Sequence, residues 1–307
     1  MKPGLFTFQV SDIPFEQLLD EAASSGIQAV ELGVTGNTLT RGLEVEQLLG
    51  NTDRRAQLVQ QVSSRGLSIS AINAMCNPLH PDLEIRTRNL AGLKAAIQLA
   101  AKLGVNRVVT GAGCPGESAQ SRNAAWVMYS EGSAEILRWQ WEEVATPVWK
   151  ELGAYAKNEG VRICIEVHPG TLAYNTDSFL RLRSIAGDAV GANFDPSHLL
   201  WQGMDPRFVA AALSGCIYHA HAKDTVLNHA AVSRNGVIES RAMDDWKHRS
   251  WSFCAMGDGH DAVFWRSVVV TLRAAGYDDV WSIEHEDATL GSLEAIRRNA
   301  AFLKRIL

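Results

Sequence analysis

Acidic and histidine side chains recur where apolar, β-branched segments end in the second half of the sequence. The residues in this position are Glu166 and His168, Asp195 and His198, His219 and His221, and Glu284 and Glu286. Carboxylate oxygens and imidazole nitrogens are ligands for divalent metal ions, and both groups can accept or donate a proton. These residue types therefore indicate metal binding and general acid–base catalysis.

One such group from each segment gives a set of three carboxylates and one imidazole. The set contains Glu166, Asp195, one of the two residues His219 and His221, and Glu284. Oxygen-rich sites with one nitrogen suit Mn²⁺, Mg²⁺ or Co²⁺ better than a structural Zn²⁺, which prefers Cys and His. Neighbouring carboxylates repel one another and raise each other's pKa, and a divalent cation removes that penalty. The set thus predicts a site for a divalent metal ion.

A purely structural role is the alternative for each of these residues taken alone. Asp195 precedes Pro196 and Ser197, a context that suits a helix N-cap as well as a ligand. His285 is better explained as a packed or supporting residue than as a ligand. Such roles do not explain why four successive segments end in these groups, so we favour a common site.

The elements that must position these side chains form one alternating series of strand and helix patterns. Strands are predicted over 4–9, 29–33, 67–73, 105–110, 161–167, 190–195, 216–221 and 280–283. Helices are predicted from Asp12 to Gly26 and over 53–65, 82–103, 133–158 with a break near Pro147, 176–185, 206–213, 262–275 and 292–306. About eight strand–helix units predict an α/β fold, a (β/α)8 TIM barrel forming a single domain over residues 1–307. An open, doubly wound sheet is the alternative.

The period of two residues along a strand places side chains two apart on the same face. The groups predicted to share a face are Glu166 with His168, His219 with His221 and Lys223, and Glu284 with Glu286. In a barrel the C-terminal strand ends meet at one mouth, where active sites are built. Burying such charges against the helices would be costly, so we expect them at this mouth.

The composition excludes several classes of partner. The 307 residues carry 29 Lys and Arg against 34 Asp and Glu, a formal charge of −5. No basic run provides the surface that a nucleic-acid binder needs, and no stretch approaches the roughly 18 consecutive apolar residues of a membrane span. The five cysteines are scattered without CxxC spacing. With no apolar leader-like segment, the expected location is the cytoplasm.

Residues 225–259 form a long polar segment. Long connections are commonly active-site lids or disordered segments, and we predict a lid that excludes water. Arg241, a candidate substrate-binding residue, lies in this segment. Trp201, Trp246 and Trp251 are candidate walls of a sugar-binding pocket, with core packing as the alternative.

Four motifs run in order along the chain: IEVHPG at 165–170, NFDPSHLLWQGMDP at 193–206, IYHAHAKDT at 217–225 and SIEHED at 282–287. Together they resemble the sugar phosphate isomerase/epimerase family, the xylose isomerase-like TIM barrels. The resemblance implies a (β/α)8 barrel and a divalent metal ion, commonly Mn²⁺. It assigns the metal ligands as Glu166, Asp195, His221 and Glu284, with His221 preferred because the family's ligand is the second His of the HxH motif.

The resemblance also implies catalytic roles. Family epimerases use two metal-bound glutamates on opposite faces of the substrate, and these match Glu166 and Glu284. His198 matches a histidine that lies near substrate oxygens. His168 and the long segment 225–259 depart from the ketose 3-epimerases and look more like a branch that includes inosose dehydratase-like and keto-glycoside-processing lyases.

We predict a divalent-metal-dependent sugar isomerase or epimerase. It would abstract a proton next to the carbonyl of a keto-sugar or polyol-derived ketone, through a metal-bound enediolate. Glu166, Glu284 or His168 would take the proton. Lys223 would bind substrate oxygens or pair with Asp224.

Other functions stay open at this point. A lyase would use the same intermediate for dehydration or β-elimination of a glycoside, with His168 as base or as acid to the leaving group. A metal-dependent nuclease of the apurinic endonuclease type would need several metals and a basic rim, which the sequence lacks. A non-catalytic sugar sensor would be expected to lose a ligand. The expected partner is a small-molecule carbohydrate, and assembly into a homo-oligomer is left open.

Overall fold

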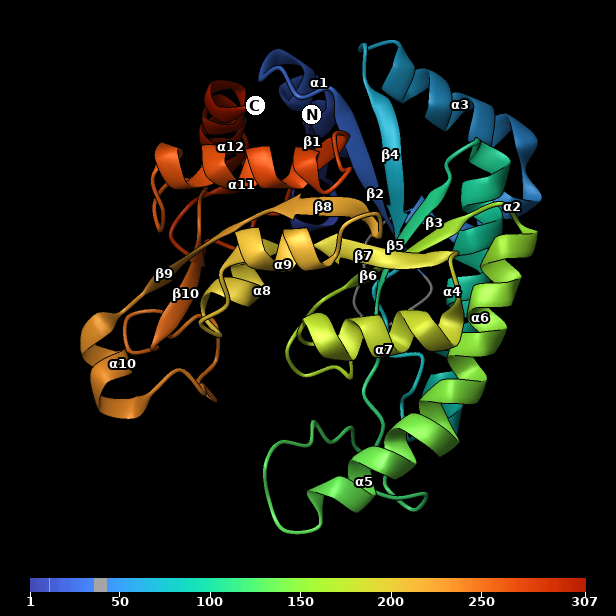
Figure 1. Cartoon of the computed structure of the whole chain (residues 1–307). Helices are drawn as coiled ribbons and strands as arrows, with labels where there is room; N and C mark the ends of the chain where they lie inside the picture. Colours follow the sequence, from blue (N-terminus) through green and yellow to red (C-terminus); the bar gives the residue numbers. More distant parts are fainter. Residues whose placement is uncertain (11, 36–42) are drawn as a thin grey trace. The chain divides into compact units, whose positions relative to one another are not determined.

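The computed structural model describes residues 1–10, 12–35 and 43–307 (Figure 1). The chain divides into two compact units whose segments alternate along the sequence. Unit 1 consists of Met1–Glu31, Gln60–Ser70 and Phe194–Leu307, and unit 2 consists of Leu32–Val59 and Ala71–Asn193. Three predicted metal ligands, Asp195, His221 and Glu284, therefore belong to unit 1, and Glu166 belongs to unit 2.

Unit 1 is built on parallel strands. They are β1 (Lys2–Phe6), the first part of β2 (Ala29–Thr35), the first part of β4 (Ser68–Asn73), β8 (Ile217–Ala222) and β11 (Val280–Ile283). β1 pairs with β11 and with β2, and β11 pairs with β8. All of β11 and almost all of β8 is buried, as expected for parallel strands covered on both faces. The register aligns Ser282 with His221, so β8 and β11 present their C-terminal ends together.

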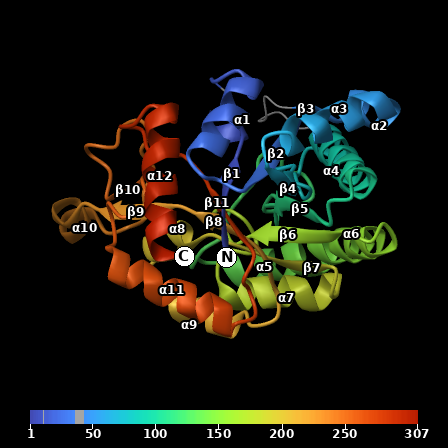
Figure 2. The ribbon, with the colours of Figure 1, turned by 90° about the horizontal axis from the view of Figure 1, so that it is seen from above.

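The helices of unit 1 lie outside these strands. They are α1 (Phe15–Ser24), α8 (Pro196–Leu200), α9 (Pro206–Ala212), α10 (His229–Asn235), α11 (Ala262–Ala274) and α12 (Ser292–Ile306), with a 3-10 turn η1 (Phe8–Val10). α11 and α12 lie side by side (Figures 1 and 2). α12 buries Ala295, Ile296, Ala300, Leu303 and Ile306, an apolar face with the period of a helix. Every helix in the described part of the chain is too short or too polar to cross a membrane.

The long polar segment 225–259 contains regular structure. β9 (Asp224–Leu227) and β10 (Trp251–Cys254) form an antiparallel pair, and α10 lies between them. In β10 the burial alternates along the strand, with Trp251 and Phe253 buried. The polar composition concealed this short alternation. Whether the segment acts as a lid stays a prediction.

Unit 2 repeats the parallel arrangement. Its strands are the second part of β2, β3 (Leu43–Glu44), the second part of β4 (Ser68–Asn73), β5 (Arg107–Gly111), β6 (Arg162–Glu166) and β7 (Val190–Phe194). β5 pairs with β4 and β6, β6 pairs with β7, and β2 pairs with β3. The register aligns Gly111, Glu166 and Asn193 at the C-terminal strand ends.

The helices of unit 2 include a distortion where the sequence predicted a break. They are α2 (Val45–Gly50), part of α3 (Thr52–Ser63), α4 (Leu83–Leu103), α5 (Ser133–Trp139), the π-helix η2 (Gln140–Ala145), α6 (Thr146–Asn158) and α7 (Thr176–Ala186). The π-helix ends just before Pro147, which has no N–H for a helical hydrogen bond. The Thr146 Oγ1 hydroxyl donates to the Trp141 carbonyl oxygen over 2.7 Å and stabilises this turn.

Candidate metal centre and active site

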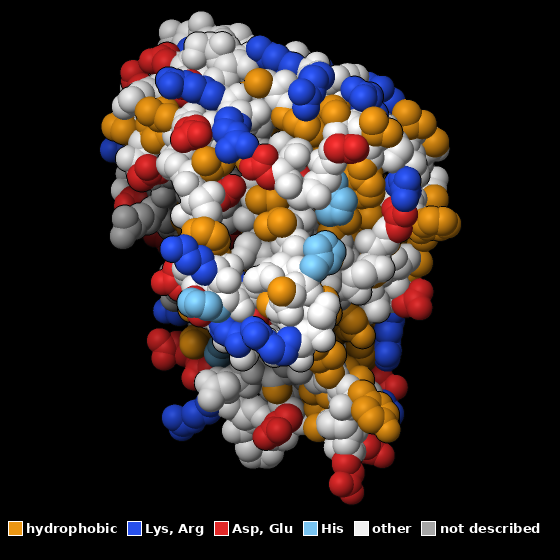
Figure 3. All heavy atoms as spheres, turned by 90° about the vertical axis from the view of Figure 1, so that its left-hand side faces the viewer, with side chains coloured by type: hydrophobic (Ala, Val, Ile, Leu, Met, Phe, Trp, Pro, Cys, Tyr) orange, Lys and Arg blue, Asp and Glu red, His pale blue; other side chains and the backbone are white. Residues whose placement is uncertain are grey.

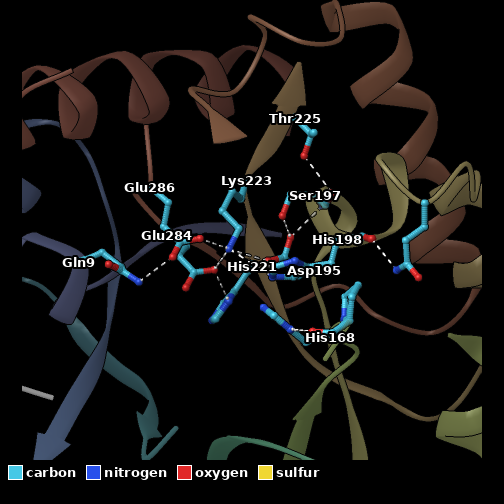
Figure 4. Close-up of polar contacts among 12 residues, drawn as sticks. Gln9, His168, Asp195, Ser197, His198, His221, Lys223, Thr225, Glu284 and Glu286 are labelled. Carbon is cyan, nitrogen blue, oxygen red and sulfur yellow. Dashed lines mark hydrogen bonds and ion pairs between the residues drawn. The ribbon is translucent and has the colours of Figure 1, made fainter. Parts of the chain in front are cut away.

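Polar side chains gather in unit 1 around the C-terminal ends of β8 and β11 (Figure 4). The cluster comprises Glu31, Asp195, His198, His219, His221, Lys223, Glu284 and Glu286. Only Glu286 has a partly exposed side chain, at 31%. Burial of this many ionisable groups is costly unless they neutralise one another or bind a cation.

The histidines of β8 face Glu31. The Nε2 atom of His219 lies 2.8 Å from Glu31 Oε2, and the Nε2 atom of His221 lies 3.1 Å from both Glu31 oxygens. The two rings meet edge to face with centroids 5.8 Å apart. The predicted shared face of the two histidines is therefore confirmed. Glu31 fixes the orientation of both imidazoles.

His221 also contacts a second carboxylate. Its Nδ1 atom lies 3.0 Å from Glu284 Oε2. Burial alone would lower the pKa of His221, but the carboxylates of Glu31 and Glu284 outweigh burial and hold that pKa well above its ordinary value. Burial alone would raise the pKa of Glu284, and Lys223 and His221 reverse this and hold it well below the usual range. The pKa of Glu31 is lowered in the same way, against burial, by His221 and His219.

Lys223 is the cation at the centre of the cluster. Its Nζ atom lies 2.6 Å from Glu284 Oε2, 2.7 Å from Glu286 Oε2 and 3.1 Å from Asp195 Oδ2. Asp224, the other partner predicted for Lys223, forms the separate set of contacts described below. Glu284 and Glu286 share a face as predicted, since one ammonium group contacts both.

Asp195 performs one of the two roles that the sequence left open, the helix cap, and its role as a metal ligand stays a prediction. Its Oδ1 atom accepts hydrogen bonds from the backbone N–H and the hydroxyl of Ser197, at 2.9 and 2.7 Å, and so caps α8. Its Oδ2 atom faces Lys223 and lies 3.3 Å from the Nε2 atom of His198. His198 Nε2 is 3.4 Å from Lys223 Nζ, and the His198 ring meets Phe253 edge-on.

The donor set suits a divalent cation. One ligand atom each from Asp195, His221 and Glu284 lies within 4.8 Å of the others. Two carboxylates and one imidazole are ligands for hard or intermediate divalent ions. Across the cluster, four carboxylates face one ammonium group and one histidine whose pKa is raised. Among these described contacts the carboxylates outnumber the cations, and a bound divalent cation would reduce their mutual repulsion.

Two predicted catalytic residues lie in unit 2. Glu166 is the buried last residue of β6 and pairs in register with Gly111 and Asn193. His168 lies in the turn that follows, where its backbone N–H donates to the Ala173 carbonyl oxygen over 3.0 Å and its Nδ1 atom contacts the Pro169 carbonyl oxygen. The catalytic and metal-binding roles of these two residues stay predictions.

Two candidate substrate-binding residues lie outside the cluster. Arg241 donates to both Glu239 carboxylate oxygens over 3.1 Å and is partly exposed. Trp201 is buried and stacks on Trp251, with ring centroids 4.5 Å apart and an interplanar angle of 6°. Phe253 completes this aromatic cluster. Substrate contacts by Arg241 and Trp201 stay predictions.

Sequence reasoning did not assign Glu31 or Glu286 to the site. Glu31 lies within β2, where its carboxylate interrupts the apolar run AVELG. A single carboxylate in an otherwise buried strand was the available signal, because such a charge needs a buried partner. Glu286 was expected to share a face with Glu284 but received no role.

A second buried carboxylate, Asp224, lies beside the cluster in sequence and has different partners. Its Oδ2 atom accepts hydrogen bonds from the backbone N–H groups of Gly257, Gly259 and His260 and from the Trp265 indole, over 2.9–3.1 Å. Its Oδ1 atom accepts from the Thr225 backbone over 2.7 Å and lies 2.8 Å from His260 Nδ1. We call these contacts the Asp224 knot. They hold the residues around 257–260 against β9.

Comparison with known proteins decides the family. A family model described as xylose isomerase-like TIM barrel matches residues 19–306. The chain belongs to this family. The predicted fold class, an α/β (β/α)8 TIM barrel, is thereby confirmed, and so is the resemblance stated from the motifs.

Relatives of this xylose isomerase-like barrel include proteins with named activities. It is 32% identical over 320 residues to the uncharacterized protein YfiH of Bacillus subtilis (strain 168), covering 100% of this chain and 99% of YfiH. It is 27% identical over 148 residues to the inosose dehydratase of Lacticaseibacillus casei, covering 48% of this chain and 47% of that enzyme.

Solved structures share the fold at low identity. A probable 3-DHS dehydratase, AsbF of Bacillus anthracis, aligns with a TM-score of 0.69 and 17% identity over 99% of both chains. The IolI protein with a bound zinc atom aligns with a TM-score of 0.69 and 19% identity over 100% of this chain and 98% of IolI. A D-psicose 3-epimerase aligns with a TM-score of 0.63 and 12% identity over 99% and 98% of the two chains. The named activities among these proteins are dehydratases and an epimerase.

Proposed function

We propose that this protein is a divalent-metal-dependent enzyme that removes a proton next to the carbonyl of a keto-sugar or polyol-derived ketone. The observation that carries the proposal is the buried convergence of Asp195, His221 and Glu284, whose ligand atoms lie within 4.8 Å of one another. Among the described residues, Lys223 is shared by Asp195, Glu284 and Glu286, and a donor set rich in carboxylates suits a divalent cation.

Asp195, His221 and Glu284 would hold the ion, and Glu166 is proposed as the fourth ligand from its sequence motif. Mn²⁺ is the first candidate, with Mg²⁺ and Co²⁺ as alternatives, because oxygen donors outnumber nitrogen donors. When bound, such an ion acts as a Lewis acid that polarises a carbonyl and stabilises negative charge on its oxygen.

The residues of the chain would then divide the remaining tasks. Glu284 is a weak base while Lys223 stays 2.6 Å away, because the ammonium group stabilises the charged carboxylate and lowers its pKa. We therefore assign proton abstraction to Glu166, with His168 as the alternative. Lys223 would donate hydrogen bonds to substrate oxygens, and the nearly complete burial of the cluster excludes water.

The first form of the proposal is an isomerase or epimerase. The proton taken from carbon returns to the neighbouring carbon in an isomerase, or to the opposite face of the same carbon in an epimerase. The epimerase form needs a second base, which is Glu284 once a substrate oxygen has drawn Lys223 away from it.

The second form is a lyase, and the position of Lys223 favours it. A proton would move from carbon to Glu166, and the adjacent C–O bond would break with its electron pair on the leaving oxygen. Lys223, a buried ammonium group beside two glutamates, could protonate that oxygen. The inosose dehydratase of Lacticaseibacillus casei is similar in sequence to this chain over about half of its length.

Exchange with solvent deuterium tests the step that both forms share. The protein, loaded with Mn²⁺ or stripped with EDTA, is incubated in D₂O with a panel of ketoses, inososes and 3-keto-glycosides, and C–H signals are followed by NMR. We expect exchange only in the loaded protein. Glu166→Gln should slow exchange by about 100-fold or more, and the exposed control Glu294→Gln should not. Equal exchange without metal would contradict the proposal, and the products separate the two forms.

The charge pattern gives no support to a nuclease. The formal charge is −5. The face in Figure 3 mixes basic with acidic side chains, whereas binding to DNA favours clustered Lys and Arg. We also propose a cytoplasmic location, because the five cysteines form no disulfide in the described part of the chain.

A further inference from the structure

Unit 2 contains a cavity of about 340 Å³ that the proposed function does not use. It is lined by Trp126, Val127, Leu137, Gln140, Trp141, Thr171, Leu172, Tyr174, Asn175, Asp177, Ser178 and Arg181. Small-molecule pockets span roughly 300–1,000 Å³, so the cavity has the size for one small ring.

The segment that follows Glu166 forms one wall of this cavity. Thr171, Leu172 and Tyr174 lie there, after β6. Backbone hydrogen bonds hold this wall, since the Leu172 N–H donates to Gly113 over 2.9 Å and the His168 N–H donates to Ala173 over 3.0 Å. The lining also includes Trp126 from the loop after β5 and Gln140 from the π-helix. The cavity thus belongs to the connections that leave the C-terminal ends of β5 and β6, where barrel enzymes bind substrates.

The π-helix fixes Gln140 in the cavity wall. Gln140 is fully buried, and its Nε2 atom donates to the carbonyl oxygens of Gly116 and Ala125 over 2.9 and 3.0 Å. The amide nitrogen therefore holds the loop after β5, while the amide oxygen is left for another donor. Single π-helical turns are rare and frequently occur at functional sites.

Two polar atoms of the lining residues have no hydrogen-bond partner among the described residues. They are the Oε1 acceptor of Gln140 and the Nε1–H donor of Trp126. Unsatisfied buried polar atoms are unfavourable, so each of these two atoms is a candidate contact for a bound ligand. One atom is an acceptor and the other a donor, and hydroxyl groups of a ligand can pair with either kind.

The remaining lining residues favour a neutral ligand with an apolar face. Trp126 and Tyr174 meet edge to face with centroids 5.4 Å apart, and the Arg181 guanidinium lies 4.5 Å above the Trp141 ring. Asp177 also lines the cavity, so its charge offsets that of Arg181. Aromatic rings next to polar groups of balanced charge suit a sugar ring better than a phosphate.

We propose that this cavity is a binding subsite for a neutral sugar ring. A second assignment rests on the proposed function. The bound ring would be the unreacting part of a glycoside, and Glu166 would remove a proton from its other ring. A free monosaccharide offers the same hydroxyl groups and apolar face as the ring of a glycoside, so the experiment tests both kinds of ligand.

Binding is tested without turnover by saturation-transfer-difference NMR on metal-free protein, with methyl β-D-glucopyranoside as the neutral probe and glucose 6-phosphate as the anionic one. We expect the neutral ring to bind more tightly. Trp126→Phe, which removes the unpaired N–H and keeps the aromatic face, should weaken binding about fivefold. Val127→Trp should abolish it by filling the cavity. Tyr129→Phe, an exposed change in the same loop, should have no effect.

Two results would overturn the subsite. One is binding that survives unchanged in Val127→Trp, and the other is the absence of any neutral-ring signal from the unaltered protein. The glycoside assignment is tested separately by turnover, where Val127→Trp should raise KM for a keto-glycoside and leave KM for the single-ring keto-sugar unchanged. An equal rise for both substrates would contradict that assignment. Binding with no exchange on any substrate would disprove the proposed function and leave the subsite intact.

Discussion

Two buried charged residues, Lys223 and Asp224, are adjacent in the chain and lie in opposite kinds of surroundings. Asp224 accepts hydrogen bonds from four backbone N–H groups and one indole and contacts His260, so its charge is dispersed over mostly neutral donors. Lys223 contacts three carboxylates, two of which belong to the predicted metal ligands. Among the described residues, the Asp224 carboxylate is surrounded by hydrogen-bond donors, whereas the single ammonium group of Lys223 is shared by three carboxylates. The sharing of one cation by several carboxylates, rather than burial, therefore distinguishes the candidate metal centre.

The largest effect is expected when the cation of the cluster is removed. Lys223→Met leaves buried carboxylates unpaired, which should lower the free energy of unfolding of the metal-free protein by about 3–5 kcal/mol. Mn²⁺ at about 100 times its Kd should restore about 2.7 kcal/mol. Urea denaturation with and without Mn²⁺ measures both values, with the exposed Lys150→Met as the control. No recovery with any divalent ion would mean that the cluster is structural.

The matching change in the Asp224 knot should behave differently. Asp224→Asn places an amide among N–H donors and leaves some of them unsatisfied, at a cost of about 1–3 kcal/mol for each buried group. The loss of stability should be the same with and without Mn²⁺. Asp258→Asn serves as the control, because it removes a neighbouring ion pair at the surface between Asp258 and Arg298. Rescue of Asp224→Asn by metal would erase the distinction between the two regions.

The next prediction tests whether Glu31 positions the histidines of β8. Glu31→Gln weakens the contacts that orient His219 and His221, and changes of this kind reduce metal affinity by about 10–100-fold. Titration calorimetry with Mn²⁺ measures the affinity, and Glu294→Gln is again the surface control. Unchanged affinity would show that Glu31 only stabilises the fold.

The smallest effect concerns Glu239. Like Asp195 and Asp224, it has a carboxylate that accepts hydrogen bonds from backbone N–H groups. Hydrogen bonds from the backbone of Arg241, Ser250 and Ser240 overcome burial and lower its pKa from 4.5 to about 2. Because the folded-state pKa is depressed, Glu239 stabilises the fold above its unfolded pKa, and this contribution is lost as the pH falls from about 4.5 toward 2. Urea midpoints across this range should fall less steeply in Glu239→Gln than in the unaltered protein. Parallel curves would contradict the assignment.

Sequence reasoning succeeded where a simple period decided the answer. The alternation along β8 placed His219 and His221 on one face, and the same rule paired Glu284 with Glu286. It failed where partners come from distant segments. No residue near Glu31 in the sequence predicts its contact with His219, which lies 188 residues away.

Local context also limited the prediction of elements. The short strands β9 and β10 are brought together across α10, and the polar residues between them hid the buried positions Trp251 and Phe253. Pro147 correctly marked a disturbance in the helix over 133–158. The form of the disturbance, a π-helical turn, depends on packing around Gln140 and Trp141. The local sequence pattern contains no information about that packing.

The cap of α8 has a consequence for denticity at the candidate metal centre. Ser197 holds one carboxylate oxygen of Asp195 with two hydrogen bonds, so only the other oxygen is available to an ion. Asp195 would therefore hold a cation through one oxygen atom and keep the other oxygen atom in the cap of α8.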